Sequence, residues 1–279
     1  GVCNFVEVKS LTYAEYVDGV VDYVAVDCEK KLGVLLRDGK YLTGALDKRV
    51  FELLQKSKQV LIKPNDITVE AIFDLCTDQA TLVSGAKISV IGVGNIGFKC
   101  ALKLTEAGAE VSLWDRKARE LNAIAATMNV VKPKGTLATP RPCNTIEQSC
   151  IDKDILISCV SASDIVNEDH IKLLNQNALV IDVGKGNLSR DAVEVINETD
   201  RTLVRLDVGY QMIRRLETMM FRTDLDRPNR KRVGTLKMVS GGAVGEAGTV
   251  IVDNVSEPRF IVGLCDGVGG IDLISDRRK

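Results

Sequence analysis

Residues 87–97 read KISVIGVGNIG, a short β-branched apolar run that leads directly into a Gly-x-Gly-x-x-Gly turn. Residues 98–107 follow with apolar side chains at helical spacing, and Gly108 stands where a left-handed helix cap is expected. A second apolar run covers residues 110–114 and ends at Asp115. Strand, glycine turn, helix, strand and acid within about 30 residues have the spacing of a βαβ unit. We therefore predict that a parallel sheet begins here.

The alternation of apolar strands with helices continues along the chain. Three further runs are predicted to be strands buried on both faces: residues 154–160, 178–184 and 203–209. Helical stretches are predicted between them, at 168–174 and 190–196. Near-continuous apolar strands that alternate with helices indicate a parallel sheet covered on both faces. The sequence therefore predicts an α/β fold in which residues 85–210 form a doubly wound parallel Rossmann sheet.

The segments on either side of this sheet are predicted to form smaller parts. Residues 1–84 contain candidate strands and helices and are interpreted as a small α/β domain that supplies substrate-binding or catalytic groups. Residues 211–279 carry short candidate strands separated by glycine turns. Within them, residues 214–232 hold seven basic residues against three acidic ones. We interpret this segment as a lid that clamps an anionic substrate group, with a solvated loop as the alternative.

Composition excludes several classes of protein. The 279 residues are 45% hydrophobic and 27% charged, with a formal net charge of −1, which is the balance of a globular chain with a core. Such a charge argues against a protein that coats nucleic acid or an anionic membrane. The eight cysteines form no Cys-x-x-Cys pair, so a disulfide framework or a structural zinc site is not expected. The start of the chain has no signal-peptide pattern. We expect a cytoplasmic protein, a homodimer, that binds neither nucleic acid nor membrane.

The glycine turn is a candidate dinucleotide site. In such turns the first glycine, here Gly92, allows the sharp turn, and Gly94 lets the backbone approach a pyrophosphate. Gly97 lets helix and strand pack closely. The helix start at Asn95 and Ile96 would present free amide groups to the phosphates. The alternative is a glycine turn in a flavodoxin-like sheet that holds no dinucleotide.

The end of the second strand bears on which dinucleotide is bound. A carboxylate at Asp115 can accept both ribose hydroxyls of NAD and would repel the 2′-phosphate of NADP. Arg116 and Lys117 follow at once and could attract that phosphate instead. The position of the acid favours NAD, and NADP stays open. Val160 and Ser161, after the strand at 154–160, complete the expected cofactor contacts.

Several stretches resemble known dehydrogenases. Residues 136–160 and 178–184 are similar to the cofactor domain of methylenetetrahydrofolate dehydrogenases, and 239–245 resembles the glycine-rich segment that closes that family's chain. The turn at 92–97 is nearer to that of shikimate and alanine dehydrogenases. The resemblance covers residues 85–250 at superfamily level. It implies a two-domain NAD(P)-dependent enzyme with its substrate in the cleft between the domains. The Tyr-x-x-x-Lys pair of the folate family has no counterpart in this sequence.

Three polar residues at predicted strand ends are candidate catalytic groups. Lys63 ends an apolar strand of the small domain and Asp66 follows it, a pairing that resembles the acid/base pair of shikimate dehydrogenases. Lys63 could transfer a proton if partly desolvated, or the two residues could orient a substrate carbonyl or carboxylate. Lys185 follows the strand at 178–184, at the sheet edge where open sheets bind ligands, and is the reserve candidate. For both lysines the alternative is a solvated loop.

Other chemistry has little support. His170, the single histidine, is interpreted as a surface helix residue, and Cys159 as a buried thiol rather than a nucleophile. No Gly-x-Ser-x-Gly or Walker motif occurs. We therefore expect an NAD(P)-dependent oxidoreductase that transfers hydride between nicotinamide and a small amino, hydroxy or imino acid. The alternatives are a dinucleotide-binding sensor without turnover and a lyase or hydrolase that uses tightly bound NAD.

Overall fold

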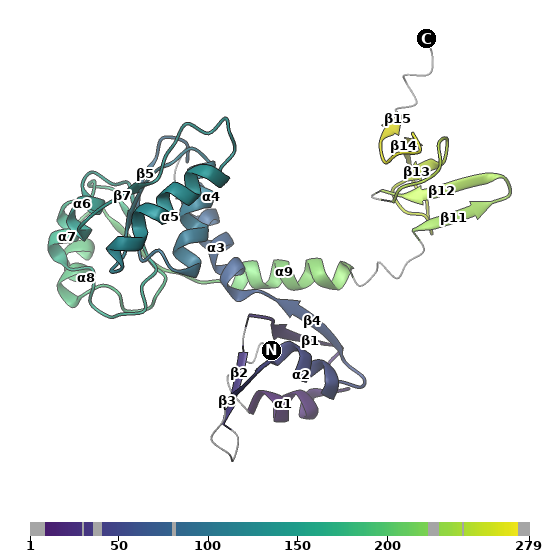
Figure 1. Ribbon diagram of the computed structural model, residues 1–279, viewed down its shortest axis with the longest axis horizontal. Helices are drawn as coiled ribbons and strands as arrows, with labels where there is room; N and C mark the ends of the chain where they lie inside the picture. The colour runs from purple at the N-terminus through teal and green to yellow at the C-terminus, as the bar shows by residue number, and fades with distance from the viewer. Residues whose placement is uncertain are drawn as a thin grey trace, which may run out of the picture. The chain divides into compact units, whose positions relative to one another are not determined.

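The computed structural model describes residues 9–29, 31–35, 41–79, 82–222, 229–241 and 243–272. The chain divides into two compact units, Gly1–Arg215 and Leu216–Lys279. The first contains a six-stranded parallel sheet and a smaller N-terminal part, and the second contains a five-stranded sheet (Figure 1).

The large sheet confirms the predicted doubly wound Rossmann fold. Its strands lie in the order β10-β9-β8-β5-β6-β7, and every neighbouring pair is parallel. Their bounds are β5 (Lys87–Ile91), β6 (Glu110–Trp114), β7 (Arg141–Pro142), β8 (Ile155–Ser158), β9 (Leu179–Asp182) and β10 (Thr202–Arg205). Strand order reverses between β5 and β8, and open α/β sheets bind ligands outside the carboxyl ends of the strands at such a point.

Both faces of the sheet are covered, as the apolar strands require. In β5 the side chains of Ile88 and Val90 join the core on one face, and Ile91 joins the core on the other. β8 divides in the same way, because side chains alternate between the faces of a strand. The covering helices are α4 (Asn95–Glu106), α5 (Ala118–Val131), α6 (Ile146–Cys150), α7 (Glu168–Lys172) and α8 (Arg190–Asn197).

The N-terminal part is a small α/β body. Its elements are α1 (Lys9–Val17), β1 (Tyr23–Asp27), β2 (Lys31–Leu35), β3 (Tyr41–Ala45), α2 (Leu46–Leu53) and β4 (Lys58–Ile62). β1 pairs in parallel with β4, and β2 with β3 in antiparallel. Four buried side chains form its core: Ala14, Val26, Leu46 and Val50. The predicted turn at 37–40 lies outside the described residues.

Helix α3 (Pro64–Gln79) corrects the prediction for residues 63–66. We expected a polar loop there, but the helix begins at Pro64 and includes Asp66 in its first turn. Proline is preset for the first helical position, and an acid in the first turn complements the helix dipole. The apolar side of α3, with Val69 and Ile72, packs into the core of the parallel-sheet domain.

Helix α9 (Gly209–Arg222) corrects the interpretation of residues 214–232 as a loop or lid. Met212, Leu216 and Met219 are half-buried and recur at helical spacing, which the count of basic residues obscured. Residues 223–228 lie outside the described residues, so nothing places Arg227.

The second unit holds a mixed sheet in the order β11-β12-β13-β14-β15. The strands are β11 (Arg230–Val233), β12 (Leu236–Ser240), β13 (Val250–Val252), β14 (Ile261–Cys265) and β15 (Ile271–Asp272). β12 and β13 are parallel, and the other pairs are antiparallel. The small cores are centred on Met238 with Val252 and on Val239 with Ile251. Across the ranges that the structure describes, no helix is long and apolar enough to cross a lipid bilayer.

Candidate dinucleotide site

The glycine turn after β5 places its three glycines in different surroundings. Gly92 has a φ of +89°, and a Cβ atom there would lie 2.7 Å from Cγ1 of Val160. A Cβ atom on Gly97 would lie 1.9 Å from the carbonyl oxygen of Gly92, so helix and turn touch. Gly94 is exposed, and nothing lies within 4 Å of the position its Cβ would take. These surroundings fit a turn, a packing contact and an open approach to the backbone, respectively.

The start of α4 offers unpaired donors beside that open space. Gly94 is the N-cap residue, and no side chain caps the helix. The amide groups of the first turn have no partner within a helix, and the helix dipole adds positive potential at this end. Asn95 is exposed and Ile96 half-buried, so the turn is accessible. An anion such as a pyrophosphate suits this arrangement.

Asp115 joins the end of β6 to the glycine turn. Its Oδ2 accepts a hydrogen bond from the amide of Val93 at 2.7 Å, and its Oδ1 accepts one from the amide of Lys117 at 2.9 Å. A carboxylate oxygen has two lone pairs, so each retains capacity for a ribose hydroxyl. Arg116 and Lys117 are exposed beside it. The structure thus brings the acid and the turn together, as their spacing in the sequence indicated.

A buried asparagine that sequence reasoning missed connects the loops after β8 and β9. Nδ2 of Asn187 donates to the carbonyl oxygens of Val160 and Ala162 at 2.9 and 2.8 Å. Oδ1 of Asn187 accepts from the Ser158 hydroxyl at 2.9 Å. Gly184 lies against this contact, since a Cβ there would be 2.0 Å from the Val160 carbonyl oxygen. Asn187 therefore fixes the sheet edge that also carries the half-buried Val160.

Lys185 lies on the β9–α8 loop at the same carboxyl edge of the sheet. Its φ of +64° is left-handed, which is unusual for a residue other than glycine. Asp182 holds this conformation, because its carboxylate accepts hydrogen bonds from the amides of Lys185 at 3.1 Å and Gly186 at 2.8 Å. Lys185 is exposed, as is Ser161 on the neighbouring loop.

Lys63 and Asp66 form an ion pair and belong to a larger charged cluster. Nζ of Lys63 lies 2.9 Å from Oδ2 of Asp66, and Nζ of Lys99 on α4 lies 2.6 Å from Oδ1. Glu29 is 3.8 Å from Lys99 and accepts from the amide of Asn65. Neither Lys99 nor Glu29 was among the predicted site residues, although Lys99 follows Asn95 by one helical turn.

This cluster fixes the charge state of its members. The hydrogen bond from Lys99, followed by that from Lys63, lowers the pKa of Asp66. The hydrogen bond to Asp66 raises the pKa of Lys63. At neutral pH, Lys63 is therefore a cation and Asp66 an anion.

His170 and Cys159 do not contribute reactive groups. The prediction of a surface histidine is wrong, because His170 is buried: its Nδ1 accepts from the Asn167 amide and its Nε2 lies 3.3 Å from Oε1 of Glu147. Burial raises the pKa of the Cys159 thiol to about 12, which disfavours a nucleophilic thiolate. Within the described ranges, no group of three or more His, Cys, Asp or Glu side chains is arranged to hold a metal ion.

Residues 87–209 match the family described as the NAD binding domain of 6-phosphogluconate dehydrogenase. This segment spans the whole parallel sheet, from the start of β5 to the start of α9. It is an NAD(P)-binding Rossmann domain of the kind found in dehydrogenases, and a dinucleotide is the cofactor that such a domain implies.

Solved structures resemble this chain at low identity. A dipicolinate synthase from Bacillus halodurans is 15% identical, with 73% of this chain and 79% of that chain covered and a TM-score of 0.44. L-tryptophan dehydrogenase from Nostoc punctiforme is 16% identical, with coverage of 78% and 60% and a TM-score of 0.46. The FolD methylenetetrahydrofolate dehydrogenase/cyclohydrolase from Campylobacter jejuni is 17% identical, with coverage of 58% and 50% and a TM-score of 0.39.

Proposed function

We propose that the protein is an NAD(P)-dependent oxidoreductase that acts on a small polar substrate, such as an amino, hydroxy or imino acid. One observation carries the proposal: the open space at Gly94, at the uncapped start of α4, beside a carboxylate on Asp115. A pyrophosphate fits the helix start, and ribose hydroxyls fit the acid.

NAD is the proposed cofactor. The Asp115 carboxylate is held by two amides at the end of β6, where it can accept ribose hydroxyls and would repel a 2′-phosphate. Arg116 and Lys117 supply positive charge beside it and keep NADP as the second candidate. When bound, the nicotinamide accepts or delivers the hydride.

The chain's own polar groups would orient the substrate. Lys63 is 51% exposed at its side chain and holds its proton through Asp66, so a role in binding a carbonyl or carboxylate is better supported than proton abstraction. Lys185 is a second cation, at the carboxyl edge of the sheet. We propose Lys63 as the first catalytic candidate, with Asp66 as its partner and Lys185 as the reserve.

Cofactor binding is tested with two matched valine variants. Gly94→Val fills the space that a pyrophosphate needs, and the φ of −76° at Gly94 is accessible to valine, so the chain should stay folded but lose NAD binding. Gly135→Val is the control, since it also adds a side chain in open space, after α5. Titration calorimetry should give no NAD heat for the first variant and normal heat for the second. Unchanged NAD affinity in Gly94→Val would refute the site.

The choice of dinucleotide and the reaction class need separate measurements. Asp115→Ala should gain affinity for NADP relative to NAD, because the repelling carboxylate is gone. Absorbance in the reduced-nicotinamide band, first on the purified protein and then with pools of amino, hydroxy and imino acids, separates the classes. Net cofactor turnover supports the oxidoreductase. Bound cofactor without net change supports a lyase or hydrolase, and neither signal favours a sensor.

A further inference from the structure

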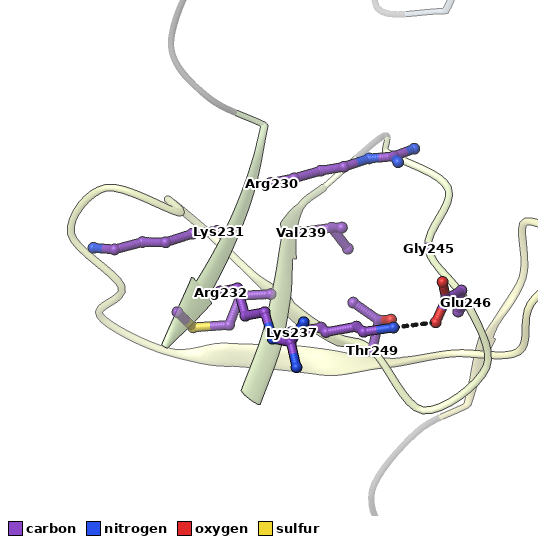
Figure 2. A pocket seen from close by; sticks show the side chains of 9 residues that line it. Arg230, Lys231, Arg232, Lys237, Val239, Gly245, Glu246 and Thr249 are labelled. Atoms are coloured by element: carbon purple, nitrogen blue, oxygen red, sulfur yellow. Dashed lines mark hydrogen bonds and ion pairs between the residues drawn. The ribbon is translucent and has the colours of Figure 1, made fainter. Parts of the chain in front are cut away.

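The β11–β12 hairpin of the second unit concentrates positive charge on one face. Its antiparallel register places Arg232 opposite Lys237 and Arg230 opposite Val239. Directly opposed residues share a face, and alternate residues along a strand return to it, so these three cations lie on the same side. Lys231 is opposite Met238 and belongs to the other face, and in Figure 2 its side chain extends away from the other cations.

These side chains line a cavity of about 360 Å³ (Figure 2). Its floor includes Val239 and Thr249, which are 2% and 6% exposed. Gly245 closes against Thr249, because a Cβ on Gly245 would lie 3.0 Å from that of Thr249. A volume of this size is that of a small-molecule site rather than of an extended groove.

One acid offsets the charge around the cavity. Glu246 forms an ion pair with Lys237, and the hydrogen bond from Lys237 lowers the pKa of Glu246. Three cations against one anion leave an excess of two positive charges on this face.

Other acids of this unit are bound to backbone amides. The Asp253 carboxylate accepts hydrogen bonds from the amides of Arg259 and Phe260, and that of Asp266 from those of Val268 and Gly270. These two carboxylates therefore stabilise loops of the unit.

The cations are held in place with donors to spare. Nη2 of Arg230 donates to the Val244 carbonyl at 3.0 Å, and Nε of Arg232 donates to that of Gly234 at 3.0 Å. A guanidinium has five N–H donors, so each arginine retains four. Like charges directly opposite each other on a strand pair are destabilising, and Arg232 with Lys237 is such a pair. A bound anion would remove that repulsion.

We propose that this cavity binds the phosphate group of a small phosphorylated molecule. An excess of two positive charges matches a phosphate monoester, which carries about −1.5 to −2 at neutral pH. Guanidinium groups bind phosphate oxygens in pairs. Nucleic acid is a poorer fit, because Phe260 is the single aromatic residue in the sequence from 229 to 272 and single strands bind by stacking on several rings. This site goes beyond the proposed oxidoreductase activity, which belongs to the other unit.

Inorganic pyrophosphate is the probe, and the full chain with Gly94→Val is the background, because the glycine turn could also bind pyrophosphate. Calorimetry at low salt should detect binding that weakens as salt is added. The double variant Arg230→Gln/Arg232→Gln should weaken it by about tenfold or more. Lys231→Gln, on the other face, is the matched control and should change affinity by less than about twofold. Glu246→Gln should strengthen binding, since it frees Lys237.

Three results would overturn the proposal. The first is no binding of pyrophosphate at millimolar concentration in the Gly94→Val background. The second is an equal loss in Lys231→Gln and in the arginine double variant, which would indicate general charge attraction. The third is tighter binding of a single-stranded oligonucleotide that the double variant also abolishes, which would assign the face to nucleic acid. None of these results bears on NAD binding, which Gly94→Val tests separately in the unit Gly1–Arg215.

Discussion

Gly97 has no room for even one methyl group. A Cβ atom there would lie 1.9 Å from the carbonyl oxygen of Gly92, so Gly97→Ala forces the start of α4 away from the turn. Overpacking of this kind costs about 1–3 kcal/mol of unfolding free energy, or more. Urea denaturation should show this loss in Gly97→Ala and little change in Gly94→Ala, where the added atom meets open space. Equal midpoints for the two variants would contradict the described turn.

Lys63 is expected to act as a fixed cation. Lys63→Met should leave NAD affinity within about threefold of the original and lower turnover by roughly 10²–10⁴, as for loss of a group in the reaction centre. Lys63→Arg keeps the positive charge and should restore part of the turnover. Because Asp66 raises the pKa of Lys63, the rate should show no lysine titration near neutral pH. Normal turnover in Lys63→Met would move the role to Lys185.

Helices α3 and α4 are joined by ion pairs one helical turn apart. Asp66 pairs with Lys99, and Glu70 pairs with Lys103. Below these pairs, Val69 and Ile72 of α3 pack in the core of the sheet domain. The charged pairs therefore lie above an apolar contact that would hold the helices together without them.

This pairing has a defined dependence on pH. The folded-state pKa of Asp66 lies below its ordinary value of 3.8, chiefly because of Lys99. Its contribution to stability is therefore present above that ordinary value and is lost as the pH falls through the lowered pKa. Asp66→Asn should lack this part of the acid destabilisation, and Lys99→Met should reduce it. Thermal melts between neutral pH and pH 2.5 or so would show it, and parallel curves for all three proteins would exclude it.

Elements whose signals are local were predictable from the sequence. The strand, glycine turn and helix at 87–106 depend on neighbouring residues, and so did the pairing of Asp115 with the turn. The burial of His170 was not predictable, because it depends on Glu147, which is distant in sequence. Asn187 was missed for the same reason, since its partners lie on another loop and no spacing separates a buried amide from a solvated one.

The two units should respond differently to the cofactor. Each has its own cores, and the dinucleotide site lies wholly in Gly1–Arg215. A ligand that binds the folded state at about 100 times its Kd adds roughly 2.7 kcal/mol to stability. Differential scanning calorimetry should therefore show two transitions, of which NAD raises one. Gly94→Val should abolish that shift without moving the other transition. A single transition that NAD shifts as a whole would contradict independent units.

Lys185 illustrates a trade-off between stability and activity. A left-handed conformation costs an ordinary residue about 1–2 kcal/mol, whereas glycine adopts it freely but loses about 0.5–1 kcal/mol through its greater freedom when unfolded. Lys185→Gly should therefore match or exceed the natural protein in stability, while Lys185→Ala keeps the strain without the charge. If both variants lose turnover and the glycine variant is the more stable, the lysine is retained at this position for its work, at the expense of a more durable loop. Heat inactivation and initial rates, measured on the two variants together, would separate these contributions.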